Sequence, residues 1–170
     1  MKTVAGGRVQ KAAIQEKAMT QHRSPRILLV DDSSAFRQGL ALVLEAEGIG
    51  NCCEASGRKQ ALDVAGRESP DIAVLDLNMG NEDTTALLAE FRKMRIPVLV
   101  CSMNENPSQV RRALAAGARG YITKSEARAV VRAVRGVLEG WMLISPRAAD
   151  SIQQEDQGAV FSWSFKQIQN

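Results

Sequence analysis

Three acidic residues follow apolar runs directly, and their chemistry fits cation binding. Asp31 and Asp32 come after "RILLV", and Asp76 comes after "IAVL". Carboxylates that lie together raise one another's pKa unless a cation compensates. Oxygen ligands without a neighbouring His or Cys favour Mg²⁺, and a carboxylate beside such an ion can attack phosphorus. The three residues therefore predict a magnesium site that supports phosphoryl chemistry.

Ser102 and Lys124 follow two further apolar runs and fit the same chemistry. Ser102 ends "VLVCS", and Lys124 comes directly after "GYIT". A hydroxyl can donate to a phosphoryl oxygen, and an ammonium group can neutralise charge on a group in transfer. Taken singly, residues of these kinds are helix caps, turn residues or surface charges. Their occurrence together, each at the end of an apolar run, favours a single site.

The elements that must position these residues alternate between strand and helix. The expected strands are Ile27–Val30, Asn51–Glu54, Ile72–Leu75, Val98–Cys101 and Gly120–Ile122. The expected helices are Ser33–Glu47, Arg58–Arg67, Thr84–Lys93, Ser108–Ala116 and Ser125–Glu139. Such alternation indicates an α/β fold, with a five-stranded parallel sheet and helices on both faces. Ligands of open parallel sheets bind beyond the carboxyl ends of the strands, where the residues above are expected.

Composition and charge fit one globular domain with tails. The net charge is +3, but residues 1–25 carry a balance of +4, so the remainder is nearly neutral. The basic pI is therefore weak evidence for nucleic-acid binding. The three cysteines lack metal-ligand spacing, and we expect reduced, buried thiols in a cytoplasmic protein. No apolar run approaches the roughly 18 residues that span a membrane.

The motifs "LLVDD", "AVLDLNM", "VLVCSM" and "GYITK" together resemble the receiver domain of two-component response regulators, which has a flavodoxin-like fold. The resemblance runs from about residue 26 to residue 139. It implies that Asp76 accepts phosphate from a sensor histidine kinase or phosphotransfer protein. It also implies that Asp32 binds Mg²⁺ directly, that Asp31 acts through water, and that Asn78 supplies a backbone carbonyl.

The same resemblance gives roles to three further residues. Ser102 matches the hydroxyl residue that moves toward the phosphoryl group, and Lys124 matches the lysine that pairs with that group. Tyr121 matches the switch aromatic, which turns inward on activation. The family thus implies a two-state surface around the fourth helix and fifth strand, biased by a local change of charge and hydrogen bonding.

Two positions depart from the family pattern. Gly80 stands where a proline is usual, four residues after Asp76, and glycine restricts the backbone less. Met103, next to Ser102, is larger than the small residue in many members and is expected to narrow access to the site. A similar Ser-Met pair occurs in receivers that carry a LuxR-type DNA-binding domain. We expect these residues to alter phosphoryl lifetime or partner fit, without abolishing phosphorylation.

We divide the chain into a flexible basic leader (1–25), a receiver domain (26–140), a linker-like helix (141–153) and a C-terminal tail (154–170). After Ile152 only "QQEDQGAVFSWSFKQIQN" follows, which is too short to bury the core of a DNA-binding domain, so we expect no direct DNA binding. Within it, the aromatic stretch 159–168 is either a docking segment or the remnant of a lost output domain.

The sequence therefore predicts a single-domain response regulator that signals by phosphorylation-dependent protein contact. We do not expect an enzyme, beyond Mg²⁺-dependent phosphoryl transfer to Asp76 and slow self-hydrolysis. The downstream protein partner is unknown, no membrane contact is expected, and a homodimer is a family-level expectation. Two alternatives stay open: a receiver-like binding or dimerisation module that is not phosphorylated, and a truncated form of a DNA-binding transcriptional regulator.

Overall fold

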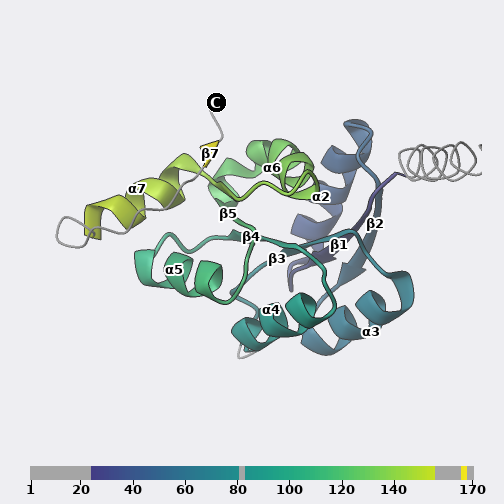
Figure 1. The fold of residues 1–170 in the computed structure, drawn as a ribbon. Coiled ribbons are helices and arrows are strands. Elements are labelled where there is room, and N and C mark those ends of the chain that lie inside the picture. The colour runs from purple at the N-terminus through teal and green to yellow at the C-terminus, as the bar shows by residue number, and fades with distance from the viewer. Residues whose placement is uncertain (1–23, 81–82, 156–165, 168–170) are drawn as a thin grey trace, which may run out of the picture.

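The computed structural model describes residues 24–80, 83–155 and 166–167. The expected leader, apart from residues 24 and 25, lies outside this part of the chain. So does the aromatic stretch 159–168, apart from residues 166 and 167. Figure 1 shows a central sheet between two layers of helices.

All strands of the sheet are parallel, in the order β2-β1-β3-β4-β5-β6-β7. The five predicted strands are β1 Arg26–Val30, β2 Asn51–Ala55, β3 Ile72–Leu75, β4 Val98–Ser102 and β5 Gly120–Thr123. Two short strands, β6 Leu143–Ile144 and β7 Lys166–Gln167, extend the sheet beyond β5. The predicted α/β fold with five parallel strands is confirmed, and the extension was not predicted.

The register brings the polar strand ends to one edge of the sheet. Val30 of β1 pairs with Leu75 of β3, so the residues that follow these two strands emerge side by side. Ser102 of β4 pairs with Thr123 of β5, which directly precedes Lys124. The order of the strands thus explains how residues far apart in sequence reach one rim.

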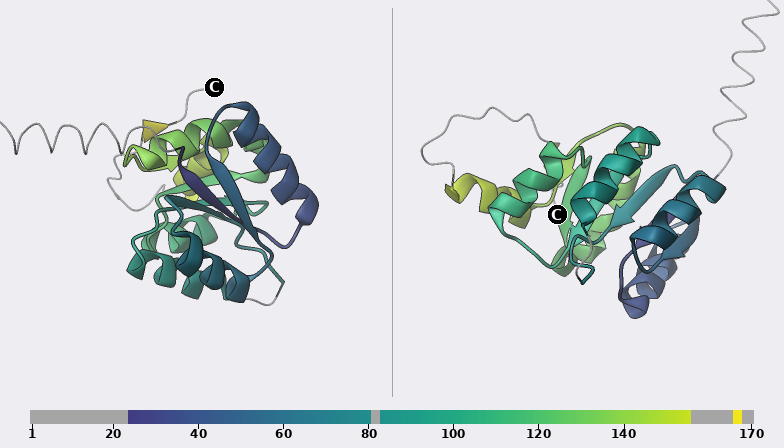
Figure 2. Two further views of the ribbon diagram at one scale, coloured as in Figure 1. Left: turned by 90° about the vertical axis from the view of Figure 1, so that its right-hand side faces the viewer. Right: turned by 90° about the horizontal axis from the view of Figure 1, so that it is seen from below.

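Helices cover both faces of the sheet. Their bounds are α2 Ser34–Ala46, α3 Arg58–Glu68, α4 Thr84–Lys93, α5 Pro107–Ala115, α6 Val130–Leu138 and α7 Pro146–Glu155. Side chains of α3, α4 and α5 pack in one core cluster, and those of α2 and α6 pack in the other. Figure 2 shows the same two layers in other directions.

The predicted helix Ser125–Glu139 is wrong in its first turn. A 3-10 helix, η1 Lys124–Ala129, comes first, and α6 begins only at Val130. The side chains of Ser125 and Glu126 contact the Thr123 hydroxyl at 2.7 and 2.8 Å, so these polar groups brace the end of β5. The predicted end of this helix near Glu139 is confirmed, and Gly140, whose φ of +90° favours glycine, follows it.

Only part of the expectation about cysteines is confirmed. Cys101 on β4 is buried, whereas Cys52 and Cys53 on the edge strand β2 are half-buried. Burial raises the pKa of all three thiols above the ordinary value. Among the described residues, no helix is long and apolar enough to cross a bilayer.

Candidate functional site

Two of the acids are held by the backbone of the sheet edge itself. Asp31 donates its backbone N–H to the carbonyl of Ala55 at 3.1 Å, and Asp76 donates to the carbonyl of Val30 at 2.8 Å. Each residue thereby extends the hydrogen-bond ladder of a parallel pair by one bond. The two residues are 3% and 4% exposed, respectively. The position of both buried carboxylates is therefore fixed by the sheet.

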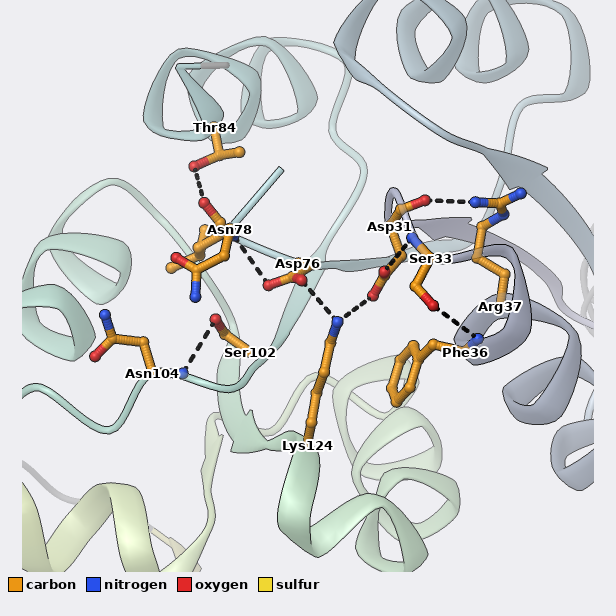
Figure 3. Close-up of polar contacts among 11 residues, drawn as sticks. Asp31, Ser33, Phe36, Arg37, Asp76, Asn78, Thr84, Ser102, Asn104 and Lys124 are labelled. Carbon is orange, nitrogen blue, oxygen red and sulfur yellow. Dashed lines mark hydrogen bonds and ion pairs between the residues drawn. The ribbon is translucent and has the colours of Figure 1, made fainter. Parts of the chain in front are cut away.

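Lys124 joins these two carboxylates (Figure 3). Its Nζ lies 2.6 Å from Oδ2 of Asp31 and 2.7 Å from Oδ2 of Asp76. Burial lowers the pKa of Lys124, but its contacts with the two carboxylates outweigh burial and raise that pKa above the ordinary value. The ammonium group therefore stays charged and compensates part of the negative charge at the rim.

Asp32 adds a third carboxylate, and the cluster fits a hard cation. One oxygen from each of Asp31, Asp32 and Asp76 lies within 4.8 Å of the others. Oδ2 of Asp31 is buried, and its partner is the Lys124 ammonium at 2.6 Å. An all-oxygen donor set with an excess of negative charge is the kind that Mg²⁺ takes.

Asp76 is also contacted from its own loop. The backbone N–H of Asn78 donates to Oδ1 of Asp76 at 3.0 Å, so each carboxylate oxygen has one donor. Gly80, two residues further on, has a φ of +57°. Proline cannot adopt that angle, which explains physically why the usual proline is absent from this loop.

Two residues that sequence reasoning missed support the acids. Arg37 donates to the backbone carbonyl of Asp31 at 2.6 Å and to Oε2 of Glu54 at 2.8 Å, tying the loop after β1 to β2. The Phe36 ring lies 4.4 Å from Nζ of Lys124, which is cation–π distance. Their place in the first turn of α2 was readable from "DDSSAFR", but Glu54 on β2 and Lys124 after β5 are distant in sequence, and no spacing reveals these contacts.

Ser102 and Tyr121 both bond to a third residue that sequence reasoning missed, Asn104. Ser102 is fully buried, and its Oγ accepts a long bond of 3.5 Å from the Asn104 backbone N–H. The Tyr121 hydroxyl donates to the Asn104 carbonyl at 2.6 Å. Burial raises the pKa of Tyr121 to about 12, although a bond with Ser102 acts in the opposite direction. Met103, between Ser102 and Asn104, is 68% exposed.

The seven predicted site residues thus lie in two connected groups. Asp31, Asp32, Asp76 and Lys124 form the charged cluster, with the Asn78 amide on Asp76. Ser102 on β4 and Tyr121 on β5 both contact Asn104 in the adjacent loop between β4 and α5. Three acids and a lysine at the carboxyl edge of a five-stranded parallel core are the arrangement expected of a receiver.

Sequence comparison gives the same result. The response regulator receiver domain family matches residues 27–135. The chain belongs to this family. The response regulator GacA of Pseudomonas viridiflava is 33% identical over 134 residues, which cover 75% of this chain and 61% of GacA. The chain thus spans less than two thirds of that relative's length.

Solved structures agree with this assignment. A two-component response regulator of the LuxR family from Aurantimonas sp. SI85-9A1 superposes with a TM-score of 0.72 at 28% identity, covering 78% of this chain and 98% of that one. The receiver domain of NarL from Mycobacterium tuberculosis gives a TM-score of 0.64 at 30% identity, covering 69% and 98%. Both are similar to this receiver in fold and in sequence.

Proposed function

We propose that this receiver accepts a phosphoryl group on Asp76 from a phosphohistidine of a sensor kinase or phosphotransfer protein. It then signals through a phosphorylation-dependent contact with another protein. The observation that carries the proposal is the convergence of Asp31, Asp32 and Asp76 on one rim, with the Lys124 ammonium between two of them. Such a cluster costs stability unless it holds a cation or a reacting group.

In the proposed reaction, a carboxylate oxygen of Asp76 attacks the phosphorus atom. The new O–P bond forms as the P–N bond to the histidine breaks, and the ring nitrogen keeps the electron pair. The product is an acyl phosphate, which water later hydrolyses. Lys124, 2.7 Å from Asp76, is placed to offset the charge of the transferred group.

A divalent ion fits the same cluster. Asp31, Asp32 and Asp76 would hold Mg²⁺, with the backbone carbonyl of Asn78 as a further ligand. When bound, this ion supplies positive charge that stabilises the transferring phosphoryl oxygens. The Asn78 N–H and Lys124, one on each oxygen of Asp76, orient the carboxylate for attack.

The change at Asp76 would reach the surface through Ser102 and Tyr121. The Ser102 hydroxyl can donate to a phosphoryl oxygen, and such a charge-assisted hydrogen bond is about twice as strong as the neutral bond that the Ser102 oxygen now accepts from the Asn104 N–H. Withdrawal of Ser102 toward that oxygen would disturb Asn104 and, through it, the Tyr121 hydroxyl. Phosphorylation thereby biases a local two-state element.

Intact-mass measurement tests this proposal. The protein is incubated with a small-molecule phosphodonor, with Mg²⁺ or with EDTA, beside the variant Asp76→Ala. We expect a gain of one phosphoryl group in the wild type with Mg²⁺, and no gain with EDTA or in the variant. No gain in the wild type, or an equal gain in the variant, would instead support a receiver-like binding module that is not phosphorylated.

A further inference from the structure

The short strand β6 lies in a recess that the receiver domain provides. Leu143 of β6 pairs with Gly120 of β5. A Cβ atom at Gly120 would lie 2.6 Å from the carbonyl oxygen of Leu143, and a Cβ atom at Gly136 of α6 would collide with the Leu143 side chain. Two glycines on different elements thus make room for one residue. The segment after α6 is therefore an integral part of the packed structure.

From this strand the chain enters α7, which covers α5 and β5. The two elements contact α7, and Figure 1 shows α7 beside α5. Ala148 and Ala149 of α7 are buried in the core cluster that includes Val110, Ala113 and Leu114 of α5. Small alanine side chains allow the two helices to approach closely. Part of the apolar face of α5 is thus covered by a helix of the same chain.

A continuous set of contacts joins this helix to the phosphorylation site. The backbone N–H of Asn104 donates to the Ser102 Oγ at 3.5 Å, and the Asn104 carbonyl accepts from the Tyr121 hydroxyl at 2.6 Å. The Tyr121 carbonyl in turn accepts the Ser145 N–H, directly before α7, at 2.9 Å. Next to Asn104, Glu105 accepts a bond from Arg147 of α7 at 3.3 Å.

We propose that α7 is an internal ligand of the α5–β5 surface, and that phosphorylation of Asp76 releases it. This inference rests on the proposed function. The Asn104 N–H donates to the Ser102 Oγ over a long and therefore weak bond, and this bond breaks readily when Ser102 moves to donate its own O–H to a phosphoryl oxygen. The resulting shift of Asn104 and Glu105 disturbs both connections to α7.

Release would uncover the parts of α5 and β5 that α7 contacts. Because this surface accommodates a helix in the unphosphorylated protein, the partner that fits it is an amphipathic helix with small or apolar residues on one face. α7 and such a partner would compete for the same surface. The receiver would then present its binding surface only after phosphorylation.

Hydrogen exchange measured by mass spectrometry tests this proposal. Exchange of the peptide that contains α7 is compared before and after phosphorylation, with intact mass measured on the same samples. We expect faster exchange in α7 in the phosphorylated sample, and no change in Asp76→Ala treated identically. Unchanged or slower exchange in a sample with the full mass gain overturns the release of α7. A missing mass gain instead overturns the proposed function.

A matched pair of surface variants tests the connection through Arg147. Arg147→Gln removes the bond to Glu105, whereas Arg67→Gln removes an exposed ion pair with Glu68 on α3, far from α7 in the chain. Because both side chains of the Arg147 pair are well exposed, its loss changes the docking equilibrium by no more than about fivefold. We expect faster exchange in α7 for Arg147→Gln alone.

Linkage gives a second readout on the same variants. If phosphorylation and release favour each other, loosening α7 must tighten binding of beryllofluoride, a non-covalent phosphoryl analogue. We expect a tighter apparent affinity in Arg147→Gln, by up to about fivefold, and wild-type affinity in Arg67→Gln. Equal affinities in a variant whose α7 exchanges faster would overturn the coupling.

Discussion

Removing the charge of Asp32 should stabilise the metal-free protein. In the cluster, Lys124 pairs with Asp31 and Asp76, while Asp32 is exposed and contributes a third negative charge. The variant Asp32→Asn keeps the size of the side chain and removes its charge repulsion with Asp31 and Asp76. Ordinary surface substitutions, by contrast, are nearly neutral in stability.

The size of the effect follows from the distances. Carboxylate oxygens within 4.8 Å of one another repel by about 0.9 kcal/mol per pair in water and by about 3.5 kcal/mol at an effective dielectric constant of 20. The lower figure applies to Asp32 because it is exposed. Two such pairs give about 2 kcal/mol, and the attraction of the nearby Lys124 offsets part of it. We therefore expect a gain of about 1 kcal/mol in the free energy of unfolding.

Urea unfolding in EDTA and in Mg²⁺ measures this effect. In EDTA, Asp32→Asn should unfold at higher urea than the wild type. With Mg²⁺ at ten times the wild-type Kd, the wild type gains about 1.4 kcal/mol and the variant gains less, so the difference shrinks or reverses. The control is Asp63→Asn, which changes an exposed acid on α3 outside the cluster. It should leave the free energy of unfolding unchanged both in EDTA and in Mg²⁺. A variant that is less stable than the wild type in EDTA would refute the interpretation of the cluster as a strained cation site.

Three further predictions follow from the buried groups and the glycines. Lys124→Met leaves the buried acids Asp31 and Asp76 without their ammonium partner. It should lower the free energy of unfolding, measured in urea without metal, by about 3–5 kcal/mol. A loss below about 1 kcal/mol would contradict the ion-pair geometry. Tyr121 is the chain's single tyrosine, and its pKa is raised to about 12, so the folded state holds this proton more tightly than the unfolded state does. The free energy of unfolding should therefore fall as pH rises from about 10 to 12. Tyrosinate absorbance at about pH 11 should be low in the folded protein and high in denaturant. Ionisation of Tyr121 near pH 10 in the folded protein would show that this side chain is not buried. Gly120→Ala should destabilise the protein and speed hydrogen exchange in β6, because the new methyl group meets the Leu143 carbonyl. Gly39→Ala on α2 has free space and should stabilise the protein by up to about 1 kcal/mol. Similar results for the two variants would contradict the recess around Leu143.

The strand ends were predictable because a buried parallel strand appears in sequence as a continuous apolar run. "RILLV", "IAVL", "VLVCS" and "GYIT" each end where polar chemistry begins, and parallel pairing then brings Asp31, Asp76, Ser102 and Lys124 to one rim. The fold and the composition of the cluster followed from this pattern and from the family resemblance. Both rest on local signals.

The supporting contacts were not predictable because they depend on tertiary packing. Nothing near Arg37 in the sequence indicates Glu54, and nothing near Asn104 indicates the Tyr121 hydroxyl. The sequence "MLIS" is too short to predict β6, whose position depends on Gly120 and Gly136 leaving space for it. The prediction that an α-helix begins at Ser125 was wrong because the side chains of Ser125 and Glu126 bond to Thr123.

Reductive trapping tests most directly whether Asp76 carries the phosphoryl group. Borohydride reduces an acyl phosphate of aspartate to homoserine, which peptide mapping then locates. After treatment with a phosphodonor and Mg²⁺, homoserine should appear at position 76 alone, with Asp31 and Asp32 unchanged. Homoserine at either of those two positions, or at none of the three in a protein that has gained the phosphoryl mass, would contradict the assignment of Asp76 as the phosphoacceptor.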